Sequence, residues 1–149
     1  MVKELIMKVL AVDDDMVNRM VFGAFLGKVR ETMLFDYEVA ESGLEALQKC
    51  ASTQFDIVFM DIMMPEMDGY EAIGAIKQIY KLQDWEFPLF VMVTACDTKE
   101  AVLKAHAAGA VGFLMKPVNK NEVVDWFQIV VMDGGCRASM PGDVGLDNI

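Results

Sequence analysis

The sequence contains little that would place the protein outside the cell or in a membrane. Its three cysteines, Cys50, Cys96 and Cys136, are far apart and odd in number, which fits neither a disulfide framework nor a metal-binding motif. No stretch reaches the roughly 18 apolar residues that a membrane-spanning helix needs. Asp13 also comes too early for the apolar segment of a signal peptide. We therefore expect a reducing, cytoplasmic setting.

Positive charge is also scarce. There are 13 Lys and Arg residues against 23 Asp and Glu residues, and the formal net charge is −10. Binding to nucleic acid or to an anionic membrane needs a basic surface, so this balance argues against both. The excess of carboxylates is instead compatible with a cation site or with a basic surface on a partner protein.

Apolar residues are plentiful enough for one folded domain. The chain has 149 residues, of which 54% are hydrophobic and 24% charged, a composition typical of a globular domain with a sizeable core. From Asp133 onward, glycine and proline interrupt a segment with few large apolar residues and no periodicity. We therefore predict a domain over residues 1–132 and a flexible Gly-rich tail over residues 133–149.

The domain is organised around residues 57–61. Residues 57–60 form a continuous apolar run with β-branched and aromatic side chains, which is typical of a strand buried on both faces. The run ends in the carboxylate of Asp61, and Pro65 and Gly69 punctuate the loop that follows. Open α/β sheets place their chemistry at the carboxyl ends of such strands. We therefore expect Asp61 to lie at the functional site.

Strands and helices are predicted to alternate along the rest of the domain. Four further strands are expected at residues 6–12, 37–40, 89–94 and 111–115. Five helices are expected to start behind Asp15, behind Ser42, near Asp68, behind Asp97 or Thr98, and at Asn119 or Asn121. This alternation predicts a parallel sheet covered by helices on both faces.

The first of these helices carries two apolar stripes. The residues expected to face the core are Asn18, Val21, Phe22, Phe25 and Val29. The second stripe consists of Val17, Met20 and Ala24 and lies roughly 100° further round the helix, counting 3.6 residues per turn. Because one apolar face is enough for the core, the second stripe predicts a partner surface. The alternative is that the last helix or its Trp126 covers this stripe.

Reactive side chains gather where the predicted strands end. They are Asp13, Asp14, Asp61, Thr94 and Lys116. The carboxyl ends of parallel strands share one edge of the sheet, so these side chains are expected to converge. Clustered carboxylates repel one another, and Mg²⁺, which prefers oxygen ligands, would relieve the repulsion. An ionised aspartate in such a site can attack a phosphoryl group, while a lysine and a hydroxyl hold the phosphoryl oxygens.

The segments that carry these residues resemble the receiver domain of two-component response regulators. The matching motifs are Val12-Asp13-Asp14, Phe59-Met60-Asp61, Met64-Pro65-Glu66-Met67-Asp68-Gly69, Val93-Thr94-Ala95 and Lys116-Pro117. The resemblance covers residues 6 to about 132. It implies a flavodoxin-like, doubly wound α/β fold, with a five-stranded parallel sheet in the order 2-1-3-4-5 and five helices. The strand order is carried over from the family.

The resemblance also implies the chemical role of the acidic residues. Asp61 would accept a phosphoryl group from a phosphohistidine of a histidine kinase or a histidine phosphotransfer protein. Asp14 would bind Mg²⁺ directly and Asp13 mainly through water. Together with Asp61, the backbone carbonyl of Met63 would complete the protein ligands. The protein would then be a phosphoacceptor that assists its own phosphorylation and dephosphorylation, rather than an enzyme.

Four further residues match positions with a structural role in the family. Thr94 would contact the phosphoryl oxygens and move with them, and Lys116 would pair with the phosphoryl group. Phe113 matches the aromatic switch position, and Pro117 would follow a cis peptide bond. The implied output is a conformational change that controls a downstream effector protein.

Three other functions remain as alternatives. A Mg²⁺-dependent aspartyl-phosphate phosphatase would need a second aspartate two residues after Asp61, where this sequence has Met63. A nucleotide-binding protein would need a Gly-rich loop after the first strand, and none follows it. A receiver-like interaction module that needs no phosphorylation would not require the intact set of acids, Thr94 and Lys116.

Overall fold

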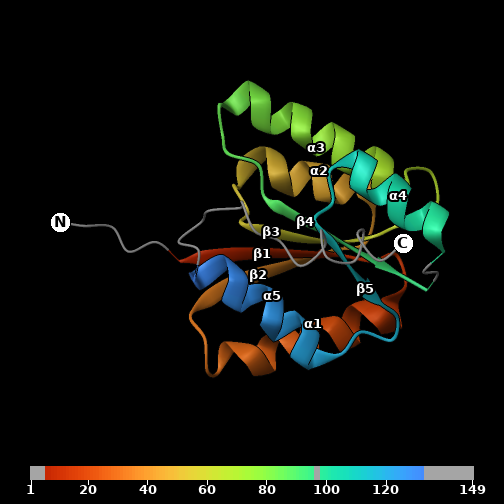
Figure 1. Ribbon diagram of the computed structural model, residues 1–149. Helices are drawn as coiled ribbons and strands as arrows, with labels where there is room; N and C mark the ends of the chain where they lie inside the picture. Colours follow the sequence, from red (N-terminus) through yellow and green to blue (C-terminus); the bar gives the residue numbers. More distant parts are fainter. Residues whose placement is uncertain (1–5, 96–97, 133–149) are drawn as a thin grey trace.

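The computed structural model describes residues 6–95 and 98–132. Five parallel strands form one sheet in the order β2-β1-β3-β4-β5, and five helices flank it (Figure 1). The doubly wound α/β architecture and the strand order predicted above are therefore confirmed. The tail predicted for residues 133–149 lies outside the described residues. So do Cys96 and Asp97.

The elements follow one another as strand and helix throughout the described chain. Their bounds are β1 Met7–Val12, α1 Met16–Arg30, β2 Phe35–Ala40, α2 Gly43–Ser52, β3 Ile57–Asp61, α3 Gly69–Gln83, β4 Leu89–Thr94, α4 Lys99–Ala108, β5 Gly112–Met115 and α5 Lys120–Met132. The largest departure from the predicted strand bounds is β2, which begins two residues earlier than expected because Met7 pairs with Phe35 in parallel register.

The sheet separates two hydrophobic layers. Helices α2, α3 and α4 cover one face, and α1 and α5 cover the other (Figure 1). Successive residues of β3 alternate between the layers, so Val58 and Met60 pack with the first set of helices while Ile57 and Phe59 pack with the second. All five β3 residues are buried, as predicted for the central strand. This double coverage holds the strand ends rigidly.

Short polar residues start the helices where the sequence predicted caps. Ser42 accepts a hydrogen bond from the backbone N–H of Glu45 (3.0 Å), and Thr98 accepts one from Ala101 (3.2 Å). Asp15 caps α1, accepting from the N–H of Asn18 at 3.0 Å. These caps fix where each helix leaves the loop that precedes it.

The predicted orientation of α1 is wrong by part of a turn. Its buried residues are Phe22, Leu26 and Val29, whereas Asn18 is exposed and Val21 is 46% exposed. The stripe at positions 22, 26 and 29 keeps the helical spacing and includes Leu26, which the predicted stripe left out. Apolar residues lie on both sides of Phe22 and Val29, so spacing alone does not decide whether Val21 or Leu26 faces the sheet.

None of the helices in the described parts of the chain is both long and apolar enough to cross a membrane. The longest, α1 and α3, have 15 residues each, fewer than the roughly 17–25 that a membrane-spanning helix needs.

Gly69 allows α3 to begin directly beneath the end of β3. A Cβ atom at this position would lie 2.4 Å from the backbone oxygen of Asp61 and 3.0 Å from the Cα of Ile62. The backbone N–H of Gly69 donates to the carbonyl oxygen of Ile62 at 2.8 Å. A side chain here would therefore push the helix away from the strand that carries Asp61.

We expect Gly69→Ala to lower the free energy of unfolding by about 1–3 kcal/mol, because overpacking against backbone cannot be relieved by a side-chain movement. Gly74→Ala on the same helix is the matched control: a Cβ there meets nothing within 4 Å, and alanine should stabilise the helix by about 0.5–1 kcal/mol. Urea unfolding of both variants measures the difference. Equal effects of the two substitutions would contradict the close approach.

Candidate functional site

Four strand ends meet at one edge of the sheet. Asp13 follows β1, Asp61 ends β3, Thr94 ends β4 and Lys116 follows β5. One carboxylate oxygen from each of Asp13, Asp14 and Asp61 lies within 4.8 Å of the other two. The strand order, which places β3 between β1 and β4, is what brings these residues together.

Lys116 supplies the positive charge of the cluster. Its Nζ lies 3.0 Å from Asp61 Oδ1 and 3.3 Å from Asp13 Oδ2. The lysine reaches the acids across the end of β4, where its backbone N–H donates to the carbonyl oxygen of Thr94 at 2.8 Å. The Lys116–Pro117 peptide bond is cis.

Burial makes the charge of Asp61 costly. Asp61 is 2% exposed, Asp13 8% and Thr94 3%, whereas Asp14 is exposed. Burial raises the pKa of Asp61 to about 7; the hydrogen bond from Lys116 opposes this shift, and the charge of Asp13 adds to it. Burial alone would lower the pKa of Lys116, but its hydrogen bond and ion pair with Asp61 leave that pKa raised.

Asp61 also has one oxygen without a partner. Oδ1 accepts from Lys116, whereas Oδ2 is buried and has no hydrogen-bond partner within the described structure. Leaving a buried carboxylate oxygen without a hydrogen bond costs about 1–3 kcal/mol or more. Three clustered carboxylates with a spare buried oxygen form a set of hard oxygen donors, which is the chemistry that a divalent cation such as Mg²⁺ requires. The residues present therefore fit a metal ion.

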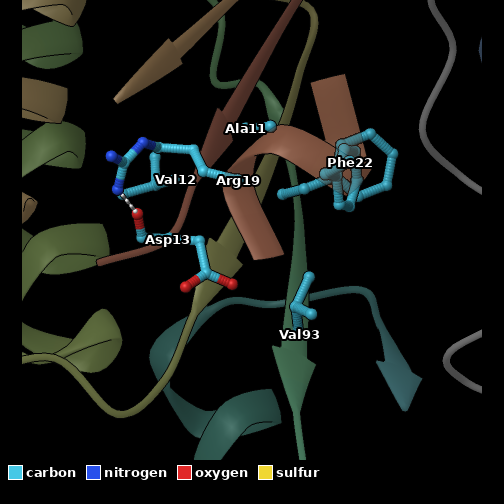
Figure 2. A pocket seen from close by; sticks show the side chains of 7 residues that line it. Ala11, Val12, Asp13, Arg19, Phe22 and Val93 are labelled. Atoms are coloured by element: carbon cyan, nitrogen blue, oxygen red, sulfur yellow. Dashed lines mark hydrogen bonds between the residues drawn. The ribbon is translucent and has the colours of Figure 1, made fainter. Parts of the chain in front are cut away.

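The loop after β1 is held through the backbone of Asp13. Its N–H donates to the carbonyl oxygen of Ala40 at 3.1 Å, and its Oδ1 accepts from the N–H of Asp15 at 2.9 Å. Its own carbonyl oxygen accepts from Nη1 of Arg19 at 2.9 Å, as Figure 2 shows. The sequence analysis gave Arg19 no role in the site. An arginine one turn into the helix that follows an acidic loop was the available signal.

The other predicted residues lie on the segments that follow or flank the cluster. Met63 is in the loop after β3, with its side chain 78% exposed. Phe113 is half-buried in β5 and packs against the layer of α2, α3 and α4. Pro117 is exposed next to Lys116.

The second apolar stripe of α1 faces outward. Val17 is 63% exposed and Met20 67% exposed, and Ala24 is exposed as well. Trp126, the residue that could have covered the stripe, is itself buried and packs over Gly112. Within the described residues, the stripe therefore remains open to solvent, as a partner surface requires.

Comparisons with known proteins agree on one family. A model of the response regulator receiver domain matches residues 9–133. Hybrid signal transduction histidine kinase B of Dictyostelium discoideum is 31% identical in an alignment of 129 residues, and the alignment covers 81% of this chain and 6% of the kinase. The chain therefore spans a small part of that much longer relative.

Solved structures agree with the fold over nearly the whole described chain. The chemotaxis protein CheY4 of Vibrio cholerae has a TM-score of 0.72 and 31% identity, covering 85% of this chain and 99% of that one. The receiver domain of Ssk1 from Saccharomyces cerevisiae, solved with the histidine phosphotransfer signalling protein Ypd1, has a TM-score of 0.77 and 25% identity. That likeness covers 89% of this chain and 94% of the Ssk1 chain.

The raised pKa of Asp61 predicts a pH-dependent stability in the absence of divalent cations. The folded state binds the proton more tightly than the unfolded chain, so this group's stabilising contribution is present below about pH 4 and is lost as the pH rises through about 7. Asp61→Asn removes this loss. With EDTA at pH 8, we expect the variant to exceed the parent in free energy of unfolding by about 2–4 kcal/mol, at 1.36 kcal/mol per pKa unit.

Chemical denaturation between pH 4.5 and 8 measures this difference. Asp125→Asn, on the exposed surface of α5, is the control for the loss of one negative charge. A constant difference between the parent and Asp61→Asn across this range would contradict the effect of burial on the pKa of Asp61.

Proposed function

The chain belongs to the response regulator receiver domain family, and from this we propose that Asp61 accepts a phosphoryl group from the phosphohistidine of a partner protein. A receiver domain acts in two-component phosphorelay signalling, which is the function of this chain. The observation that carries the residue assignment is the buried carboxylate of Asp61, paired through one oxygen with Lys116 while its other oxygen has no hydrogen-bond partner in the described structure.

In the proposed reaction, an oxygen of Asp61 attacks the phosphorus atom. An O–P bond forms, the N–P bond of the phosphohistidine breaks, and the imidazole nitrogen leaves with the electron pair of that bond. The carboxylate must be ionised to attack, and its burial opposes ionisation. The Lys116 ammonium at 3.0 Å counteracts that penalty. The same ammonium can then hold a phosphoryl oxygen, since phosphoryl transfer depends mainly on positioning and charge neutralisation.

We assign the metal site to Asp13, Asp14 and Asp61, with the backbone carbonyl of Met63. Mg²⁺ bound there would neutralise part of the charge that develops on the transferred phosphoryl oxygens. The exposed side chain of Asp14 leaves the cluster accessible to an incoming ion. The burial of Asp13 and its hydrogen bond with the N–H of Asp15 instead restrict that carboxylate to one orientation.

We assign the conformational switch to Thr94 and Phe113. Thr94 is the last residue of β4 and lies beside the acids, and Phe113 is half-buried in the neighbouring strand β5. A cavity of about 10 Å³ adjoins Phe113, with α4 residues Val102, Ala105 and His106 on its wall. If the hydroxyl of Thr94 moves towards a phosphoryl group, the ring of Phe113 can turn further inward, and the face of α4, β5 and α5 then changes for a downstream effector.

We also propose that residues 1–132 are the receiver domain, in agreement with the family match over residues 9–133. Phosphotransfer would take place in the cytoplasm, with a histidine kinase or a histidine phosphotransfer protein as the donor. The exposed stripe of Val17, Met20 and Ala24 is the proposed docking surface for that donor. The chain would assist its own phosphorylation and dephosphorylation without turning over a separate substrate.

Labelling with a small phosphodonor tests the phosphoacceptor. With acetyl phosphate and Mg²⁺, intact-mass measurement should show the parent gaining one phosphoryl group (HPO₃), and Asp61→Asn should gain none. Asp56→Asn, at the opposite end of β3, is the control and should label like the parent. Undiminished labelling of Asp61→Asn would contradict the assignment of Asp61 as the phosphoacceptor. Release of phosphate from many phosphomonoesters would instead favour the phosphatase alternative, and no labelling of a folded parent would favour the phosphorylation-independent module.

The docking surface predicts a difference between protein and small-molecule donors. Met20→Glu places a charge in the exposed apolar stripe, so we expect phosphotransfer from a cognate histidine protein to slow about tenfold, the equivalent of roughly 1.4 kcal/mol. Labelling by acetyl phosphate should be unchanged. Leu82→Glu, at an 88% exposed position on α3, controls for the added charge. Unchanged phosphotransfer from the histidine protein would show that the stripe has no role in docking, whereas equal slowing with both donors would indicate misfolding.

A further inference from the structure

We propose that Arg19 is a positioning residue, which holds the loop of Asp13 and Asp14 in the arrangement that a divalent cation requires. This inference rests on the proposed function, because it concerns the same metal site. Arg19 offers no ligand atom to the metal. It instead forms a hydrogen bond with the backbone of the loop that carries the acids. Its effect is therefore on the orientation of the loop and not on the ligand set.

The contact of Arg19 is with the main chain of Asp13. Nη1 donates to the carbonyl oxygen of Asp13 at 2.9 Å. In Figure 2 the carboxylate of Asp13 points away from this hydrogen bond. Both carboxylate oxygens of Asp13 thus remain in the site, where Oδ1 accepts from the N–H of Asp15 and Oδ2 lies 3.3 Å from Lys116.

This hydrogen bond fixes the peptide group that joins Asp13 to Asp14. The N–H on the other side of Asp13 is already bonded to Ala40 of β2, at 3.1 Å. Without Arg19, the carbonyl of Asp13 loses this charge-assisted bond, and the peptide that follows it can rotate. Because Asp14 is exposed, the direction of its carboxylate depends on the orientation of this peptide. Loosening the peptide therefore makes the three carboxylates converge less often.

Arg19 is itself held in place. Its side chain is 18% exposed, and its residue lines a cavity of about 10 Å³ together with Phe22, Phe59 and Val93. Its backbone N–H donates to the carbonyl oxygen of Asp15 at 2.9 Å, within the first turn of α1. The second guanidinium nitrogen lies 3.8 Å from Glu41, whose side chain is 66% exposed. That ion pair is weak in solvent, so the main-chain contact is the one that positions the loop.

Arg19→Met keeps the apolar stem and removes the donors. We expect its dissociation constant for Mg²⁺, measured by isothermal titration calorimetry, to rise about tenfold. Arg30→Met is the matched control, since Arg30 lies on the same helix and pairs with Asp36 on the surface; its Mg²⁺ affinity should equal that of the parent. Arg19→Lys, which retains a single charged donor, should lie between the parent and Arg19→Met.

A measurement without metal separates positioning from general stability. In EDTA, we expect the amide proton of Asp15, which is bonded to Asp13 Oδ1, to exchange about tenfold faster in Arg19→Met than in the parent. Amides of β4 should exchange at parental rates. Unchanged Mg²⁺ affinity and unchanged exchange at Asp15, or uniform acceleration across the sheet, would overturn the proposal. Both measurements can be made even if the parent is not phosphorylated. A failure of this proposal can therefore be distinguished from a failure of the proposed function.

Discussion

The rest of the site depends on the contact of one ammonium group with two buried carboxylates. Lys116 Nζ lies 3.0 Å from Asp61 and 3.3 Å from Asp13, and both acids are almost fully buried. Leaving either acid ionised without this partner would cost several kcal/mol. The lysine comes from the end of β5 and the aspartate from the end of β3, with β4 between them. The strand order is therefore a requirement of the site as much as of the fold.

The contact with Lys116 compensates only part of the negative charge and hydrogen-bonding capacity of the site. The cluster has three carboxylates, of which Lys116 contacts two. One buried oxygen of Asp61 has no partner among the described residues, and the pKa of Asp61 is raised to about 7. A cation that binds this cluster, or a phosphoryl group that bonds to the free oxygen, would reduce this electrostatic cost and so stabilise the folded state. The single sheet, which helices cover on both faces, holds the acids in place, and the backbone bonds of Asp13 fix the first loop.

Much of this could be predicted from the sequence because it depends on local patterns. The continuous apolar run before Asp61 predicted a strand buried on both faces, and the alternation of strands and helices predicted the parallel sheet. Parallel strands must end at one edge, so Asp13, Asp61, Thr94 and Lys116 could be placed together before any distance was known. The strand order itself came from the family resemblance, because the alternation alone is compatible with several orders.

The remainder depends on tertiary contacts that periodicity does not encode. The rotation of α1 was wrong because apolar residues flank Phe22 and Val29 on both sides, and only packing against β1 and β3 buries Leu26 in place of Val21. Arg19 was missed because its partner is a backbone oxygen, which an arginine one turn into a helix after an acidic loop does not by itself identify. The unpartnered oxygen of Asp61 likewise follows from the burial of the whole cluster.

A crystal structure with Mg²⁺ and beryllofluoride, which stands in for the phosphoryl group, would show whether Asp61 and its neighbours form the phosphoacceptor and metal site. We expect beryllium bonded to an oxygen of Asp61, one fluorine beside Lys116 Nζ and another beside Thr94, and Mg²⁺ held by Asp13, Asp14 and Asp61. We also expect Arg19 to keep its bond to the carbonyl of Asp13. Beryllofluoride bound at another residue, or Mg²⁺ bound away from these three acids, would contradict these roles.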